Sequence, residues 1–193
     1  AVGLMVTKPV DAYFPAVGPT HMAQVAGGAF QQGLTPLSMM AAPSFNDAFV
    51  REGFALAPLF TSGSMYLMAF VAPYEAETAG HATMRATFSA MGIDSANTFL
   101  VAGWASQHHL KGVLEAANKG GDLTRAGIRR AAGSVYVDSD GMMPQRELGQ
   151  NRADAESFIA VPDGTIASGV KLLAGNYVGP SAGGYDWESG PCS

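Results

Sequence analysis

His108 and His109 are adjacent histidines, the side chains of this sequence that most directly indicate metal or proton chemistry. They lie in GWASQHHLKGVLEAANKGG, which predicts a helix that ends at a glycine pair. Neighbouring residues on a helix point about 100° apart, whereas a helical metal pair needs side chains at i and i+4. We therefore expect His108 to continue the apolar face of Trp104 and His109 to lie on its flank, with a ligand-cleft or pH-sensing role as the alternative.

The same helix is predicted to carry two apolar stripes on roughly opposite sides. Helical spacing places on one side Leu110, Val113, Leu114 and Ala117, and on the other Val101, Trp104, Ala105 and His108.

Other combinations of reactive residues are incomplete. DSDG at 138–141 resembles the start of a calcium loop, but Met142 and Gly149 stand where oxygen ligands are required, so we predict a type I turn. The sequence has no G-x-S-x-G and no G-x-x-x-x-G-K-[ST], and GGAFQQG does not lie between a strand and a helix. We predict no catalytic residue, no metal site and no cofactor, and a binding protein in preference to an enzyme.

Two predicted strands end in turns that could bind a ligand. In an open parallel sheet, ligands bind beyond the carboxyl ends of the strands, where backbone N–H groups of the following turns suit a carboxylate. Ser44 adds a hydroxyl donor, and aromatic walls come from the start of the long helix. The candidate ligand-binding residues are Pro15, Ala16, Val17, Ala42, Pro43, Ser44, Phe45, Phe99 and Trp104.

A β–α–β unit must position the two turns. VDAYFPAV at 10–17 predicts a buried strand, Thr20 is expected to cap a helix that stops at Gly33, and PLSMMA at 36–41 predicts a second strand. A unit of about 30 residues with this order requires a parallel sheet with a crossover helix.

The remaining elements alternate in the same way before a final hairpin. Glu75 and Glu77 are expected at a helix start, where acids favour the helix dipole. The predicted elements are a short helix at 43–53 capped by Ser44, a strand at 61–73, helices at 75–92, 98–121 and 122–134, and a hairpin at 156–173 turning at Pro162–Gly164.

Composition bounds the class of protein. The chain has 193 residues, 48% of them hydrophobic and 14% charged, enough for one large domain or two small ones. The net charge is −5 and no basic run occurs, so we expect no nucleic-acid partner. The first residues lack a basic segment and a cleavage site, so we expect no signal peptide within this sequence. The lone Cys192 is expected to be free or to pair outside the chain.

The order of segments resembles type I periplasmic solute-binding proteins of ABC importers, the branched-chain amino-acid-binding or leucine-binding family. VDAYFPAVGPTHMAQVAGGAFQQGLTP resembles its strand–helix–strand, and GWASQHHLKGVLEAANKGGDLTRAGIRRAAGSVYVDSDGMMP resembles a later helical segment. Trp104 stands where that family usually has Tyr, and Ala105–Ser106 where it has Asp-Ala.

The resemblance implies an α/β fold of the type I periplasmic-binding class, with two Rossmann-like lobes joined by a hinge. This chain would cover about the second half of such a protein. Residues 1–73 would form part of the second lobe, 74–150 would supply helices to the first lobe after a crossing near 71–75, and 151–193 would cross back as a hairpin and tail. The missing half would hold the signal peptide of the precursor and a partner for Cys192. Without that half, the chain should expose strand edges and apolar helix faces.

The resemblance also implies a function. The expected protein is an extracytoplasmic solute-binding component of an ABC importer, periplasmic or extracellular, with or without a lipid anchor. Its partners would be a small-molecule ligand, the membrane permease and the missing N-terminal half. No acid precedes Asp47 after the second strand, which disfavours an α-amino acid and favours an aromatic carboxylate or amide. The alternatives are a ligand-sensing receptor domain on the same fold and an α/β enzyme using His108 or His109.

Overall fold

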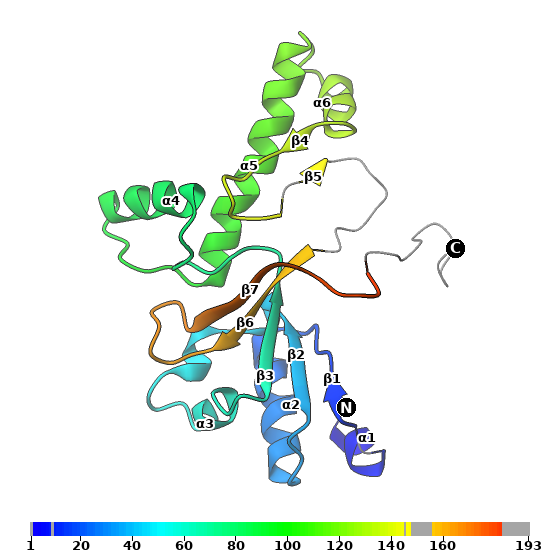
Figure 1. The fold of residues 1–193 in the computed structure, drawn as a ribbon, viewed down its shortest axis with the longest axis vertical. Coiled ribbons are helices and arrows are strands. Elements are labelled where there is room, and N and C mark those ends of the chain that lie inside the picture. Colours follow the sequence, from blue (N-terminus) through cyan, green and yellow to red (C-terminus); the bar gives the residue numbers. More distant parts are fainter. Residues whose placement is uncertain (1, 9, 145, 148–155, 183–193) are drawn as a thin grey trace.

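The chain folds into a five-stranded sheet with helices at its side and above it (Figure 1). A computed structural model describes residues 2–8, 10–144, 146–147 and 156–182. The strand order is β1-β2-β3-β6-β7, in which β1, β2 and β3 run parallel and β6 and β7 are antiparallel. The predicted α/β class is therefore confirmed.

The β–α–β unit forms as predicted, with different boundaries. It consists of β1 (Ala12–Tyr13), α2 (Pro19–Gln31) and β2 (Leu37–Ala41), and β1 pairs with β2 in parallel. Gly33 follows the C-cap with φ +74°, a conformation that glycine adopts without strain. The prediction of Thr20 as the cap was wrong, because Gly18 takes that position and Pro19 begins the helix. The prediction of a buried first strand was also wrong, since β1 is a short edge strand.

The segment between β2 and β3 is irregular where one short helix was predicted. It contains two 3-10 helices, η1 (Ala42–Ser44) and η2 (Asp47–Val50), followed by α3 (Ala57–Phe60). The Asn46 side chain accepts a hydrogen bond from the Ala48 N–H at the start of η2, so Asn46 takes the capping role predicted for Ser44. β3 (Met65–Ala69) then occupies the centre of the sheet.

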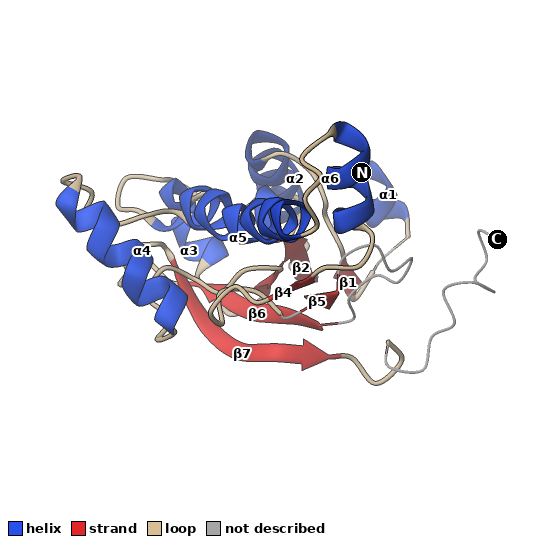
Figure 2. Ribbon diagram, turned by 90° about the horizontal axis from the view of Figure 1, so that it is seen from above, coloured by secondary structure: helices blue, strands red, loops and turns tan. Residues whose placement is uncertain are grey.

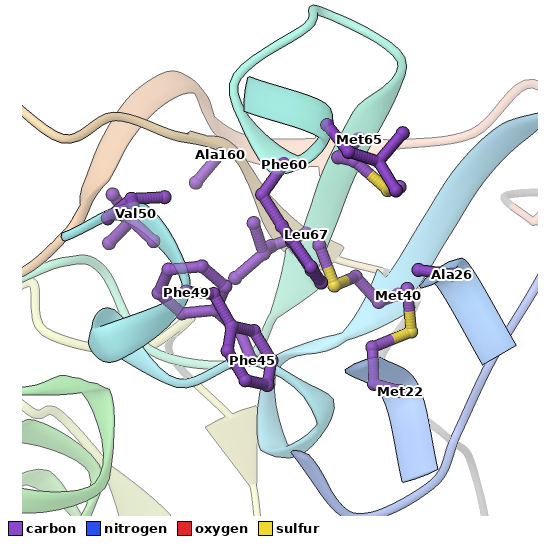
Figure 3. Close-up of a cluster of buried hydrophobic side chains, with 12 residues drawn as sticks. Met22, Ala26, Met40, Phe45, Phe49, Val50, Phe60, Met65, Leu67 and Ala160 are labelled. Carbon is purple, nitrogen blue, oxygen red and sulfur yellow. The ribbon is translucent and has the colours of Figure 1, made fainter. Parts of the chain in front are cut away.

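A hydrophobic core fills the space between the sheet and these helices (Figure 3). Met40 of β2, Leu67 of β3 and Ala160 of β6 point into it from the sheet, and Met22 enters from α2. The rings of Phe49 and Phe60 pack with 4.7 Å between their centroids, which closes the core below η2.

The upper part of the molecule is built from three helices. α4 (Ala79–Ala90), α5 (Thr98–Lys119) and α6 (Arg125–Ala132) are capped by side chains of Thr78, Asn97 and Thr124. β4 (Tyr136–Val137) and β5 (Arg146–Glu147) form a separate antiparallel pair. This pair and α1 (Val2–Thr7) were not predicted, because such short elements carry no periodic pattern.

The final hairpin returns the chain to the main sheet. β6 (Glu156–Pro162) pairs antiparallel with β3, and β7 (Val170–Val178) pairs with β6. The connecting loop is longer than the predicted Pro162–Gly164 turn, and β7 extends five residues beyond the predicted hairpin. Cys192 lies outside the described residues, and the assignment of the chain to two lobes stays a prediction.

The turn at DSDG differs from the predicted type. The Met142 N–H donates to the Ser139 carbonyl at 3.1 Å, and the central residues Asp140 and Gly141 have φ of +52° and +82°. Positive φ at both central positions belongs to a type I′ turn, so the prediction of type I was wrong.

The stripes of α5 are buried unequally. Val101 and Ala105 are buried against α4 and Met142, and His108 is half-buried beside them as predicted. On the other side Val113 and Ala117 are buried, but Leu110 is 54% exposed and Leu114 is also exposed. The expected exposed apolar helix face is therefore present on α5.

Alanine substitutions at Gly80 and Gly103 should change the stability of the protein in opposite directions. A Cβ at Gly80 would lie 2.5 Å from Met142 Cγ and 2.8 Å from the Ser139 carbonyl oxygen, whereas Gly103 in α5 has nothing within 4 Å. Gly80→Ala should lower the free energy of unfolding by about 1–3 kcal/mol through overpacking. Gly103→Ala should raise it by about 1 kcal/mol, because alanine is the better helix former. Urea denaturation of both variants checks this, and equal effects would contradict it.

Candidate functional site

The two predicted ligand-binding turns meet at the carboxyl edge of the parallel strands. Ser44 joins them: its Oγ accepts a hydrogen bond from the Val17 N–H at 3.0 Å and donates one to the Pro15 carbonyl at 3.3 Å. The Ala41 N–H donates to the same carbonyl at 3.1 Å. The structure therefore brings the turns at 15–17 and 42–45 together, as expected from the ends of neighbouring parallel strands.

The Ser44 hydroxyl is used inside the protein. Its side chain is fully buried, and both of its hydrogen bonds go to the turn that follows β1. The expectation of a free hydroxyl donor at Ser44 was wrong, and the Val17 N–H is likewise already bonded. Ser44 instead fixes the shape of the edge, because a buried hydroxyl that loses its partners is costly.

The other turn residues divide by burial. Ala42 and Phe45 are buried, and Phe45 packs edge-on against Phe49 in the core, so its side chain points away from the edge (Figure 3). Ala16, Val17 and Pro43 are exposed, and Pro15 is half-buried. The accessible part of the candidate site is therefore apolar.

The predicted aromatic walls lie in different places. Phe99 is 48% exposed on the first turn of α5, the helix that contacts η1 and whose lower end lies above β2 and β3 (Figure 1). Trp104 packs edge-on against Phe88 of α4, with 5.6 Å between ring centroids. Together with His108, Trp104 lines a cavity of about 330 Å³ between α4, α5 and the turn at Asp140. Phe99 thus lies exposed on the first turn of α5, and Trp104 belongs to the α4–α5 groove that this cavity forms.

The first charged residues after the turn at 42–45 bind each other and the β6–β7 loop. The first acid after β2, Asp47, lies 3.6 Å from the Arg51 guanidinium. Arg51 in turn donates to the Ile166 carbonyl at 3.1 Å, which holds the β6–β7 loop against η2. A larger hollow of about 810 Å³ lies between η2, α3 and that loop, away from the predicted turns.

The crossover between β3 and α4 contains polar contacts that the sequence did not reveal. The Glu75 carboxylate accepts hydrogen bonds from the Ser168 N–H at 2.9 Å and the Ser168 hydroxyl at 2.5 Å. Arg85 donates to the Tyr74 and Ala76 carbonyls at 2.9 and 3.0 Å. The expectation that Glu75 starts a helix was wrong, because it ties the crossover to the loop before β7. The sequence feature that could have indicated this is the position of Glu75, three residues before the helix cap Thr78 and therefore outside the helix.

His81 is buried at the same crossover. Its Nε2 lies 3.2 Å from the Ala72 carbonyl oxygen, which only accepts, so Nε2 donates and Nδ1 accepts from the Thr78 hydroxyl at 2.7 Å. Burial lowers the pKa of His81 below its ordinary value of 6.5, although the Ala72 hydrogen bond opposes this. Arg85 also lowers this pKa, and Glu77 and Glu75 raise it. A neutral histidine therefore fixes α4 against the crossover.

Within the described residues, no three His, Cys, Asp or Glu side chains gather as a metal site requires. No helix among them is long and apolar enough to cross a bilayer. Among the described candidate residues, Val17 and Phe99 are exposed apolar side chains.

The fold is that of substrate-binding proteins of ABC transporters. Three solved structures match nearly the whole chain, and the resemblance noted from the sequence is confirmed at the level of fold. No protein-family model and no curated protein matches the sequence.

The matched structures differ in their similarity to the chain. A fatty acid ABC transporter substrate-binding protein from Thermomonospora curvata has a TM-score of 0.80 at 21% identity, over 95% of this chain and 47% of its own. An ABC transporter substrate-binding protein from Aeropyrum pernix has a TM-score of 0.68 at 14% identity, and the match covers 94% of this chain and 48% of that protein. A branched-chain amino acid ABC transporter protein from Thermus thermophilus with bound valine has a TM-score of 0.59 at 12% identity, and the match covers 93% of this chain and 49% of that protein. The chain spans about half the length of each.

Ser44→Ala should destabilise the protein by about 1–3 kcal/mol, because the Val17 N–H and the Pro15 carbonyl lose their buried partner. Ser62→Ala is the control, since Ser62 is exposed and the contacts described for its hydroxyl are with Ser64. Urea denaturation measures both, and hydrogen exchange should quicken at Val17 in the first variant alone. Unchanged exchange at Val17 would contradict the role given to Ser44.

His81 predicts a pH dependence of stability. Its pKa is lowered in the folded state, so the unfolded chain binds the extra proton, and the His81 contribution is full above about 6.5 and falls as pH drops below that value. His81→Gln should reduce the slope of unfolding free energy against pH in this range. Denaturation at a series of pH values measures it, with exposed His21→Gln as the control. An unchanged slope in the first variant would refute the assignment.

Proposed function

We propose that the chain is part of an extracytoplasmic solute-binding protein of an ABC importer. The observation that supports this most is the fold match to a substrate-binding protein over 95% of the chain with a TM-score of 0.80. Such a protein would capture its ligand between two lobes without chemical conversion, and closure would follow from tighter binding to the closed state.

The proposed ligand is a small molecule with a carboxylate or amide and an apolar body. The exposed candidate residues Ala16, Val17 and Phe99 are apolar, and the Asp47 carboxylate forms an ion pair with Arg51. These features favour an aromatic or alkyl carboxylate over an α-amino acid, whose ammonium group needs an acid. The structural neighbour named as a fatty acid substrate-binding protein supports a ligand with an apolar body. The neighbour with bound valine is the reason to include an amino acid in the ligand screen.

Within this proposal, the edge residues 15–17 and 42–45 with Phe99 would form one wall of the ligand cleft. Ser44 would hold the wall in shape, and exposed side chains would make the contacts. Trp104 would contribute from the α4–α5 groove.

The proposed whole protein would act outside the cytoplasm and deliver its ligand to a membrane permease. Residues 1–73 and 156–182 would belong to one lobe, since their strands form one sheet. Residues 74–144 would belong to the other, together with part of the half of the protein that is absent from this chain. His81 and Glu75 would then lie at a hinge crossing.

A ligand screen on the full-length protein tests the proposal. Decanoate, benzoate, benzamide, valine and glycine would be added one at a time in thermal-shift measurements. We expect stabilisation by an apolar carboxylate or amide, about 2.7 kcal/mol at 100 times Kd, and none by glycine. Absence of stabilisation by every compound would count against a solute-binding role.

Phe99→Ala tests the proposed wall. Removing this exposed ring should weaken binding of the best ligand about tenfold, because its apolar contact is lost, and should leave folding stability nearly unchanged. Leu123→Ala removes a similarly exposed apolar side chain before α6 and is the control. Titration calorimetry measures both, and equal affinities would remove Phe99 from the site.

A further inference from the structure

The groove between α4 and α5 is formed without any residue of the turns at 15–17 and 42–45. The two helices lie side by side in both views (Figure 1, Figure 2), and Phe88 of α4 packs against Trp104 of α5. The cavity of about 330 Å³ between them is at the small end of the range for small-molecule sites, about 300–1000 Å³. The groove therefore has room for a ligand with few atoms.

One wall of the groove is a single side of α5. Trp104, His108 and Lys111 follow one another at i, i+4 and i+7, which places them on the same side of the helix. Trp104 and His108 are half-buried, whereas Lys111 is exposed. The Lys111 ammonium lies 3.8 Å from the Glu115 carboxylate, but these side chains are 72% and 68% exposed, so the ion pair between them is weak. This wall therefore offers an aromatic surface and a cation.

The other wall carries an acid whose backbone is held in place. The Asp140 N–H donates to the Asp138 carboxylate at 2.9 Å, and the Asp140 carbonyl accepts from the Gly80 N–H at the start of α4 at 3.0 Å. Gly80 permits this close approach, because a Cβ there would lie 2.8 Å from the Ser139 carbonyl oxygen. Asp140 lines the groove and is exposed, and in the described part of the chain no cation forms an ion pair with it.

The two opposite charges of the groove select a class of ligand. A simple carboxylate would be attracted by Lys111 but repelled by Asp140, and a simple amine would be attracted by Asp140 but repelled by Lys111. A zwitterion meets a charge of opposite sign on each wall. An aromatic group on that zwitterion would also gain contact with the Trp104 ring, since aromatic pairs pack favourably.

We propose that the α4–α5 groove is a second small-molecule site, for an α-amino acid with an aromatic side chain. The ligand ammonium would lie at Asp140, its carboxylate at Lys111 and its ring against Trp104. His108, between Trp104 and Lys111 on α5, would complete that wall. The inference goes beyond the proposed cleft and does not depend on it, because α4, α5 and the turn at 138–141 form the groove by themselves.

The groove is also separate from the exposed apolar stripe of α5. At about 100° per residue, Trp104 and His108 lie roughly 80–160° around the helix from Leu110 and Leu114. A part of the longer protein that covers Leu110 and Leu114 would therefore leave the groove accessible to a ligand.

Titration calorimetry of the full-length protein with phenylalanine tests the proposal. We expect a Kd below about 1 mM for phenylalanine. Two analogues isolate the charges: 3-phenylpropanoate lacks the ammonium group, and 2-phenylethylamine lacks the carboxylate. Each should bind about tenfold more weakly than phenylalanine, because each leaves one charge of the groove without a partner.

Variants of the two charged residues assign the site. Asp140→Asn should weaken phenylalanine binding about tenfold without weakening 3-phenylpropanoate binding, whereas Lys111→Gln should weaken both about tenfold. Asparagine tolerates the positive φ of position 140 and Lys111 is exposed, so both variants should fold. Lys119→Gln, exposed in the last turn of α5, is the control and should bind phenylalanine normally. Trp104 is left unchanged, because it is shared with the proposed cleft.

Absence of phenylalanine binding, or equal affinities for phenylalanine and 3-phenylpropanoate, would overturn the proposal. Phenylalanine binding that Phe99→Ala weakens, while Asp140→Asn and Lys111→Gln leave it unchanged, would assign the amino acid to the cleft and would overturn it as well. A thermal-shift screen without a cleft ligand, combined with phenylalanine binding that depends on Asp140 and Lys111, would reject the proposed cleft and support the groove. The two proposals therefore fail separately.

Discussion

The register of the central strand β3 is the constraint on which the rest of the structure depends. Its parallel pairing with β2 and antiparallel pairing with β6 place Leu67 between Met40 and Ala160, which builds the core. The same register places Met68 on the opposite side, in line with Ile159. A shift of one residue would exchange the two faces, because side chains alternate along a strand. The core, the opposite face of the sheet and the carboxyl edge therefore follow from one set of backbone hydrogen bonds.

The end of β3 also controls how the upper helices attach. Hydrogen bonds hold the crossover in place. Buried His81 donates to the Ala72 carbonyl, Arg85 donates to the carbonyls of Tyr74 and Ala76, and Glu75 accepts from Ser168 before β7. The contact of Glu75 joins segments that are 93 residues apart, and the other contacts tie α4 to the crossover directly before it. In a binding protein that closes around its ligand, such a cluster would set the resting angle of the hinge.

Periodicity and turn residues made much of the fold predictable. The helices at α2, α4, α5 and α6 and the strands β2, β3, β6 and β7 follow from apolar spacing, with Gly33 marking an end. The candidate site was predictable only as a region. Ser44 was correctly placed beside the turn after β1, but its hydroxyl is consumed by Val17 and Pro15, and Phe45 turns into the core, because long-range contacts decide where a side chain points.

The sequence by itself determined the α/β class, the parallel β–α–β unit and the absence of a complete catalytic motif, because these depend on local spacing and residue type. Only the tertiary structure decided that Trp104 lies in the α4–α5 groove, that Glu75 binds Ser168 and that Phe45 packs into the core. Each of these depends on residues far apart in the chain, whose meeting is set by strand register and crossover handedness and leaves no pattern in a single segment.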